Sequence, residues 1–243
     1  MHKLLSCILA ANLMAAGILS PSTASAASPA TQGAVSSSLD GADASSVSLT
    51  GQAVEKKAGN IEGFRSAKFG MTEKQVRKAI VQDFEVNKAD ISKDVHPLER
   101  TTILLVPVTD LLPRTGSAVV AYIFGFKSKR LMQVNVVWGN NGGKRNIGQL
   151  GAVLIALRNY FSGMAFQPES LARDLPLADG TVLAFRGADT KGRMVTLIGQ
   201  GLTAVPYKNG KIQKPDPGKA GVQLSYIATP RAPDIFRVGE GDF

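Results

Sequence analysis

The sequence has 243 residues, 44% of them hydrophobic, which fits a globular body of one ordinary domain or two small ones. Its single cysteine, Cys7, excludes a disulfide framework and a zinc site built from several thiolates. The formal charge of +9 favours anionic partners or, as an equal alternative, serves only to keep the protein soluble.

The first 26 residues have the features of a secretory signal peptide. Lys3 supplies the positive start, residues 4–19 are mostly apolar, and Ala24-Ser25-Ala26 is a small-residue cleavage site. We therefore expect a periplasmic protein without Cys7, in which 27 basic and 19 acidic residues remain. Nucleic acid is not an expected partner in that compartment. No later apolar run approaches the roughly 20 residues of a membrane span, so no transmembrane segment is expected after processing.

Residues 27–60 are rich in Ala, Ser, Gly and Thr and predict a disordered leader before a folded part that starts at Ile61. The first helix is expected after Thr72, because Thr72 and Gln75 form a capping-box pattern. Its apolar stripe recurs every four residues, at Val76, Ile80 and Phe84.

Three strands are predicted next, over residues 101–108, 117–126 and 130–138. The second strand has an apolar face of Val120, Tyr122, Phe124 and Phe126, and the third has one of Met132, Val134, Val136 and Trp138. An odd-numbered loop, Lys127-Ser128-Lys129, would place both faces on one side of the sheet. We expect Phe124, Phe126 and Trp138 to lie in the core.

A similar order follows. Asn146 is the expected cap of a second helix that ends at Gly163, with an apolar stripe of Ile147, Leu150, Leu154, Leu157 and Phe161. Strands are predicted at residues 181–186, 193–198 and 222–226, before an irregular tail, 230–243. The fold class is thus α+β, with helices on antiparallel sheet. Residues 61–139 and 140–229 are either two tandem helix-plus-three-strand units or one domain of alternating elements.

The capped helix and first hairpin resemble those of a known family. Gly70-Met71-Thr72, Gln75-Val76 and Ile80, followed by Tyr122-Ile123-Phe124, Lys129, Leu131 and Val134, are similar to the SmpA/OmlA outer-membrane assembly lipoproteins. The resemblance covers about 70 residues of the first half and implies a fold like that of the beta-lactamase inhibitory proteins. It also implies action through protein contacts. The chain is longer than that family and has no lipidation cysteine after its apolar region.

Few residues are candidates for catalysis, metal binding or cofactor binding, and none of these is expected. His96 is more typical of an ordinary loop residue than of a base or metal ligand. The carboxylate pairs Asp179 with Asp189 and Glu99 with Asp110 lack any sign of a cleft.

Basic loops are the remaining candidates. Gly139 to Arg145 forms a Gly-rich connection that lacks the Walker A spacing but could bind an anion. The candidate anion- or partner-binding residues are Lys127, Lys129, Arg130, Lys144 and Arg145. We expect a non-catalytic envelope protein that binds another envelope protein, as an accessory of outer-membrane assembly. The alternative is binding of anionic envelope lipid or polysaccharide through these loops.

Overall fold

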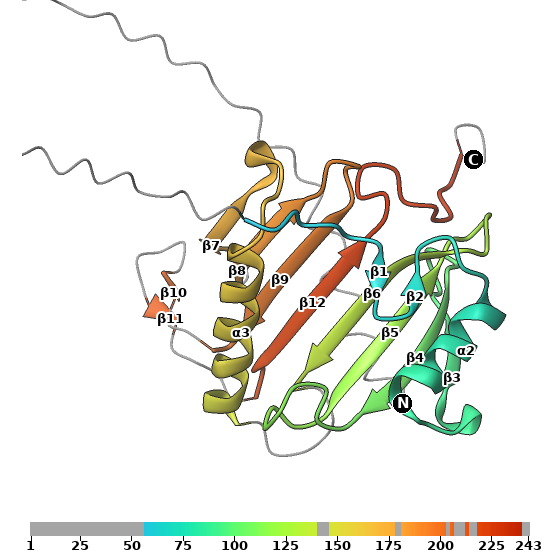
Figure 1. Cartoon of the computed structure of the whole chain (residues 1–243), viewed down its shortest axis with the longest axis horizontal. Coiled ribbons are helices and arrows are strands. Elements are labelled where there is room, and N and C mark those ends of the chain that lie inside the picture. Colours follow the sequence, from blue (N-terminus) through green and yellow to red (C-terminus); the bar gives the residue numbers. More distant parts are fainter. Residues whose placement is uncertain are drawn as a thin grey trace, which may run out of the picture. The chain divides into compact units, whose positions relative to one another are not determined.

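The structure, a computed structural model, describes residues 56–139, 146–177, 181–202, 205–206, 212–213 and 218–239. Its centre is one eight-stranded antiparallel sheet in the order β3-β4-β5-β6-β12-β9-β8-β7 (Figure 1). The fold is therefore α+β, as predicted, although the sheet dominates. The sheet strands are β3 (Ser92–Val95), β4 (Thr102–Val108), β5 (Ala118–Phe124), β6 (Leu131–Trp138), β7 (Ala172–Pro176), β8 (Thr181–Ala188), β9 (Met194–Gln200) and β12 (Gly221–Ile227).

The remaining elements are short hairpins and helices. The helices are α2 (Glu73–Phe84) and α3 (Ile147–Ser162), with the 3₁₀ turns η1 (Lys88–Asp90) and η2 (Pro168–Ser170). Two small hairpins pair β1 (Gly63–Phe64) with β2 (Ala67–Lys68) and β10 (Val205–Pro206) with β11 (Ile212–Gln213).

One order of elements occurs twice along the chain: an α-helix, a 3₁₀ turn and four strands of the large sheet. Each half thus contributes four strands rather than the predicted three, and β6 and β12 pair at the centre, so that both halves share one sheet. The additional strands, β3 and β7, lie at the two edges. They are largely exposed, and edge strands of this kind lack the apolar alternation by which a strand is recognised in sequence.

Both helices begin where capping residues predict. The Thr72 side chain accepts from the Gln75 N–H, and the Gln75 side chain accepts from the Thr72 N–H, which confirms the capping box of α2. Asn146 Oδ1 accepts from the Gln149 N–H at 3.1 Å at the start of α3, and the helix ends before Gly163. The stripes of the two helices are buried or packed against the core, as expected.

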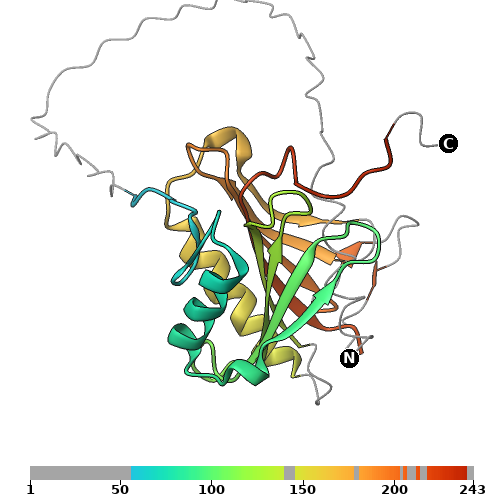
Figure 2. The same ribbon diagram turned by 90° about the vertical axis from the view of Figure 1, so that its right-hand side faces the viewer.

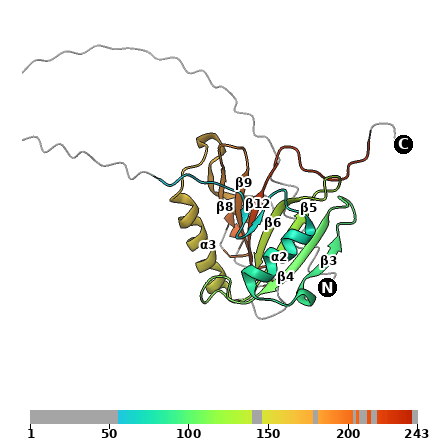
Figure 3. The ribbon, with the colours of Figure 1, turned by 45° about the vertical axis from the view of Figure 1, so that its right-hand side comes forward.

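The two described α-helices and the β1–β2 hairpin lie on the same face of the sheet (Figure 2). Helix α3 contacts β8, β9 and β12, while α2 lies over the opposite half of the sheet, near β4 and β5 (Figure 3). The main apolar core lies between this face and the helices and includes Tyr122, Phe124, Trp138, Phe161 and Phe185.

The register of the first hairpin agrees with the odd-loop prediction. Tyr122 pairs with Val134 and Val120 with Val136, so their side chains share the core face. A bulge near Phe124, which pairs with Leu131, shifts Met132 out of this set, and Met132 packs on the other face of the sheet. The prediction for Phe126 was also wrong, because Phe126 lies beyond the end of β5 and is only partly buried.

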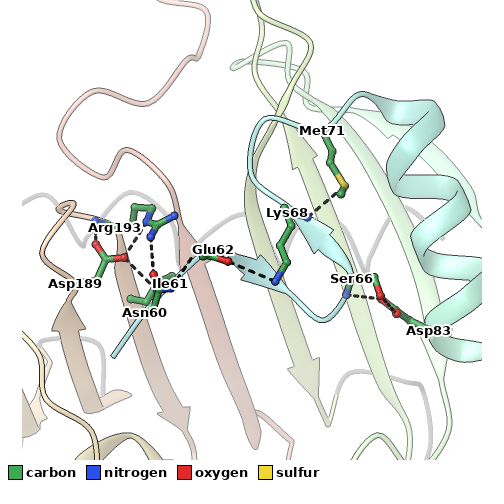
Figure 4. Close-up of polar contacts among 9 residues, drawn as sticks. All are labelled: Asn60, Ile61, Glu62, Ser66, Lys68, Met71, Asp83, Asp189 and Arg193. Carbon is green, nitrogen blue, oxygen red and sulfur yellow. Dashed lines mark hydrogen bonds and ion pairs between the residues drawn. The ribbon is translucent and has the colours of Figure 1, made fainter. Parts of the chain in front are cut away.

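The segment before α2 crosses the helix-bearing face and connects the two halves (Figure 4). At one end, the Ile61 N–H donates to the carboxylate of Asp189 in the β8–β9 turn at 3.1 Å. At the other end, the Ser66 N–H donates to Asp83 of α2 at 3.0 Å. Contacts begin before Ile61, because Ala58 already bridges to Ala165 after α3.

Candidate functional site

The sheet face opposite the two described helices carries a second, smaller set of buried side chains. We call it the helix-free face, because no described helix lies on it (Figure 2). Strand pairing and packing place the following residues on it: Ile103, Leu105, Val119, Ala121, Ile123, Met132, Gln133, Asn135, Val137, Thr196, Gln223 and Ser225. None of these twelve side chains is charged.

The apolar part of this face lies over β4, β5 and β6. Its buried centre consists of Ile103, Ala121, Ile123 and Val137. Around this centre, Leu105, Val119 and Met132 are apolar and only partly buried. Contiguous exposed apolar patches, rather than single apolar residues, are typical of surfaces that another molecule covers.

A polar row continues the face across the centre of the sheet. Gln133 Nε2 donates to Asn135 Oδ1 at 2.9 Å on β6, and Gln223 Nε2 donates to Ser225 Oγ at 3.1 Å on β12. Asn135 and Ser225 are direct partners in the β6–β12 pairing, so the same arrangement occurs on both sides of the sheet centre.

Asn135 is the polar residue of this row whose hydrogen bonding is incomplete. Its side chain is fully buried, yet Nδ2 has no hydrogen-bond partner among the described residues. A buried donor left without an acceptor costs about 1–3 kcal/mol. Sequence reasoning missed the row, because alternating Gln and Asn in a strand is also typical of a solvent-exposed face.

The basic candidate residues lie in two places. Lys127, Lys129 and Arg130 are exposed in the β5–β6 turn, as the sequence predicts for a tip. Lys144 and Arg145 fall outside the described residues, as do all residues of the Gly-rich connection that follow Gly139.

A carboxylate from the C-terminal region occupies the β5–β6 turn. Asp234 Oδ1 accepts from the Lys127 N–H at 2.9 Å, and Oδ2 accepts from the Ser128 N–H at 2.8 Å. Desolvation raises the pKa of Asp234, but hydrogen bonds from Ser128 and Lys127 together outweigh it and hold this pKa below its ordinary value. No local signal in the Pro-rich tail predicts this long-range contact.

His96 is a structural residue of the β3–β4 turn. It is buried, and its Nδ1 accepts from the Glu99 N–H at 2.8 Å. Its backbone N–H and carbonyl also bond across the turn, to Thr101 and Arg100. The loop assignment is confirmed, and the imidazole stabilises the turn.

Of the two carboxylate pairs, only Glu99 with Asp110 lies wholly within the described residues. Asp179 lies outside the described residues. Asp189 is buried and accepts from the backbone N–H groups of Ile61, Lys191 and Arg193 and from Arg193 Nε, at 2.8–3.1 Å. Glu99 precedes β4 and Asp110 follows it, so a whole strand of about 20 Å separates them. Within the described ranges, no group of three His, Cys, Asp or Glu residues is arranged to hold a metal ion.

Two further findings concern the chain as a whole. No helix among the described residues combines the length and the apolar character needed to cross a membrane. Comparisons with protein-family models, with curated proteins and with solved structures give no match.

Proposed function

We propose that this chain is a non-catalytic exported protein of the periplasm that binds another envelope protein through the helix-free face. The observation that carries the proposal is the apolar cluster of this face, whose outer members Leu105, Val119 and Met132 remain partly exposed. The resemblance of the first half to SmpA/OmlA lipoproteins supports a more specific form, an accessory of outer-membrane assembly.

The composition of the face indicates the chemistry of the partner. The twelve residues named above are uncharged, and among the described strand residues of this face the charged side chains are Asp94 of β3 and Arg186 of β8. A neutral, mainly apolar segment of the partner would therefore bury area here without desolvating a charge.

A non-catalytic role is supported by how the candidate acids are engaged. The Asp189 carboxylate is buried among four N–H donors and joins the β8–β9 turn to the segment before α2. Such an acid stabilises the fold, and proton transfer to a substrate would require it to give up these bonds.

The anionic-ligand alternative is less well supported. Its best candidate, the β5–β6 turn, already uses two backbone N–H donors for the Asp234 carboxylate. A lipid phosphate or an acidic sugar would have to displace this group, as any anionic ligand of this turn must, so we assign the proposed function to the helix-free face.

We also infer that the two halves arose by duplication of a helix-plus-four-strand unit. The order of elements supports this, and so does the match between Gln133-Val134-Asn135 and Gln223-Leu224-Ser225 at the central strand pair. The helix-free face would then be a composite of two related half-faces.

Affinity isolation with paired variants tests the proposed function. The tagged wild-type protein and the Leu105→Glu and Met132→Glu variants are isolated from the periplasm of the producing cells, and co-purifying proteins are quantified by mass spectrometry. Ile155→Glu is the matched control, because Ile155 is an apolar residue of α3 that is 56% exposed.

We expect one discrete partner with wild type and with the control, reduced about tenfold or more in both face variants, since a charge in an apolar interface costs several kcal/mol. Equal recovery from all four proteins would contradict binding through this face. Turnover of a small molecule by the purified protein would contradict the non-catalytic role.

A further inference from the structure

A second surface lies at the β5–β6 turn, apart from the helix-free face and from the function proposed for it. Residues 229–238, which we call the C-terminal strap, extend along this turn after β12 ends. Two backbone hydrogen bonds attach the strap to the rest of the chain: the Phe126 N–H donates to the Asp234 carbonyl at 2.7 Å, and the Phe236 N–H donates to the Glu99 carbonyl at 2.9 Å. The strap thus bridges the β5–β6 turn and the β3–β4 turn.

The turn is shaped to receive a carboxylate. Consecutive N–H groups of Lys127 and Ser128 point at the two oxygens of Asp234. A side chain at Gly125 would overlap this carboxylate, so the glycine leaves the space that the anion fills. Successive backbone N–H groups of this kind form an anion-binding concavity.

The strap is held mainly by polar and aromatic contacts. No residue from 229 to 239 is buried, and its main apolar contact is the Phe236 ring, 5.5 Å from the ring of Phe126 and 4.1 Å from the Arg100 guanidinium. Segments with few buried apolar contacts open at low free energy compared with global unfolding. We therefore expect the strap to detach at a lower free energy than the sheet unfolds.

The charges of the strap fit this turn poorly. The turn carries Lys127, Lys129 and Arg130 as exposed cations, and the strap brings two further cations, Arg231 and Arg237, with one anion, Asp234. A segment that keeps the aspartate but replaces the arginines with acidic residues would complement the turn better.

We propose that the β5–β6 turn is a binding site for an aspartate in an acidic, extended segment of a partner protein, and that the C-terminal strap occupies this site in the free chain. The Asp234 carboxylate has the position that the partner's aspartate takes. Displacement of the strap exposes Phe126, whose ring then packs against the partner.

Synthetic peptides test this proposal on the full-length chain. The first peptide has the sequence of residues 229–238, the second carries Arg231→Glu and Arg237→Glu, and the third carries these changes together with Asp234→Asn. Each is titrated by calorimetry into the wild-type chain and into Asp234→Asn, whose own strap is weakened. Asp110→Asn is the control chain, because Asp110 is an exposed aspartate after β4.

We expect the acidic peptide to bind Asp234→Asn about tenfold more tightly than it binds wild type or the control, with an affinity that falls as salt rises. The peptide without the aspartate should bind about tenfold more weakly. Gly125→Ala should abolish binding, with a far-UV circular dichroism spectrum that shows an intact fold. Peptide contact is located independently by hydrogen exchange at Lys127 and Ser128.

Three outcomes would overturn the proposal. The first is no binding to any chain. The second is equal binding of the acidic peptides with and without the aspartate, which would show only unspecific charge attraction. The third is equal binding to wild type and to Asp234→Asn, which would show that the strap does not occupy the site. Each leaves the proposal for the helix-free face unaffected.

Discussion

Replacing Asp189 by alanine should destabilise the fold more than any other single loss of a carboxylate in the described chain. The carboxylate is 3% exposed, and its removal leaves the Ile61 N–H and Arg193 Nε without their acceptor. Removing one partner of a buried ion pair costs about 3–5 kcal/mol. The Arg193 side chain is 15% exposed, so water can reach it, and the lower value, about 3 kcal/mol, applies.

Urea unfolding followed by circular dichroism measures this loss as a lower midpoint at constant m. In a thermal melt it corresponds to a fall of roughly 6–12 °C for a domain of this size. The control is Asp174→Asn, which removes the charge from an ion pair between Arg158 (38% exposed) and Asp174 (54% exposed) and suits the positive φ of 51° at this position. It should cost less than about 1 kcal/mol. Equal losses in the two variants would refute the structural role assigned to Asp189.

Three further predictions concern pH and local contacts. Burial raises the pKa of Asp189, but hydrogen bonds from Ile61 and Arg193 outweigh burial and lower this pKa. The stabilisation by Asp189 is therefore present above about pH 4 and is lost as pH falls through the folded-state pKa. The difference in unfolding free energy between wild type and Asp189→Ala should narrow in acid, and a difference independent of pH would contradict this. Tyr122→Phe should leave stability unchanged or raise it by about 1 kcal/mol at pH 7, because the buried hydroxyl has no hydrogen-bond partner in the part of the chain that the structure describes. Burial raises the pKa of Tyr122, so wild type should lose stability above about pH 10 and the variant should lose less, as chemical unfolding at each pH will show. Thr72→Ala should lower the free energy of unfolding by about 1 kcal/mol through loss of the α2 cap, whereas no loss in urea unfolding would show that the capping box contributes little.

Features determined by neighbouring residues were predictable from sequence. The caps at Thr72 and Asn146 are local hydrogen bonds, and both helices begin where these residues predict. The shared core face of Tyr122 and Val134 follows from alternation within each strand, which the pairing confirms. The shift of Met132 could not be predicted, because a bulge depends on the paired strand and not on the residue itself.

Contacts between distant parts of the chain left no local signal. Asp234 binds a turn that lies more than a hundred residues earlier, and Asp189 accepts from the Ile61 N–H, which is also more than a hundred residues away in the sequence. The joining of both halves into one sheet depends on the β6–β12 pairing, which no periodicity within either strand reveals. The prediction that basic residues cluster at the β5–β6 tip was correct, but the binding of Asp234 to the backbone of this turn could be seen only in the structure.

Site-specific photo-crosslinking in the producing cells tests binding through the helix-free face most directly. A photoreactive residue is placed at Met132 on this face and, in a separate strain, at Ile155 on α3. We predict one discrete adduct with an envelope protein from Met132, absent from Ile155 and lost when Leu105→Glu is added. Adducts of equal yield from both positions, or none from Met132, would contradict a partner on this face.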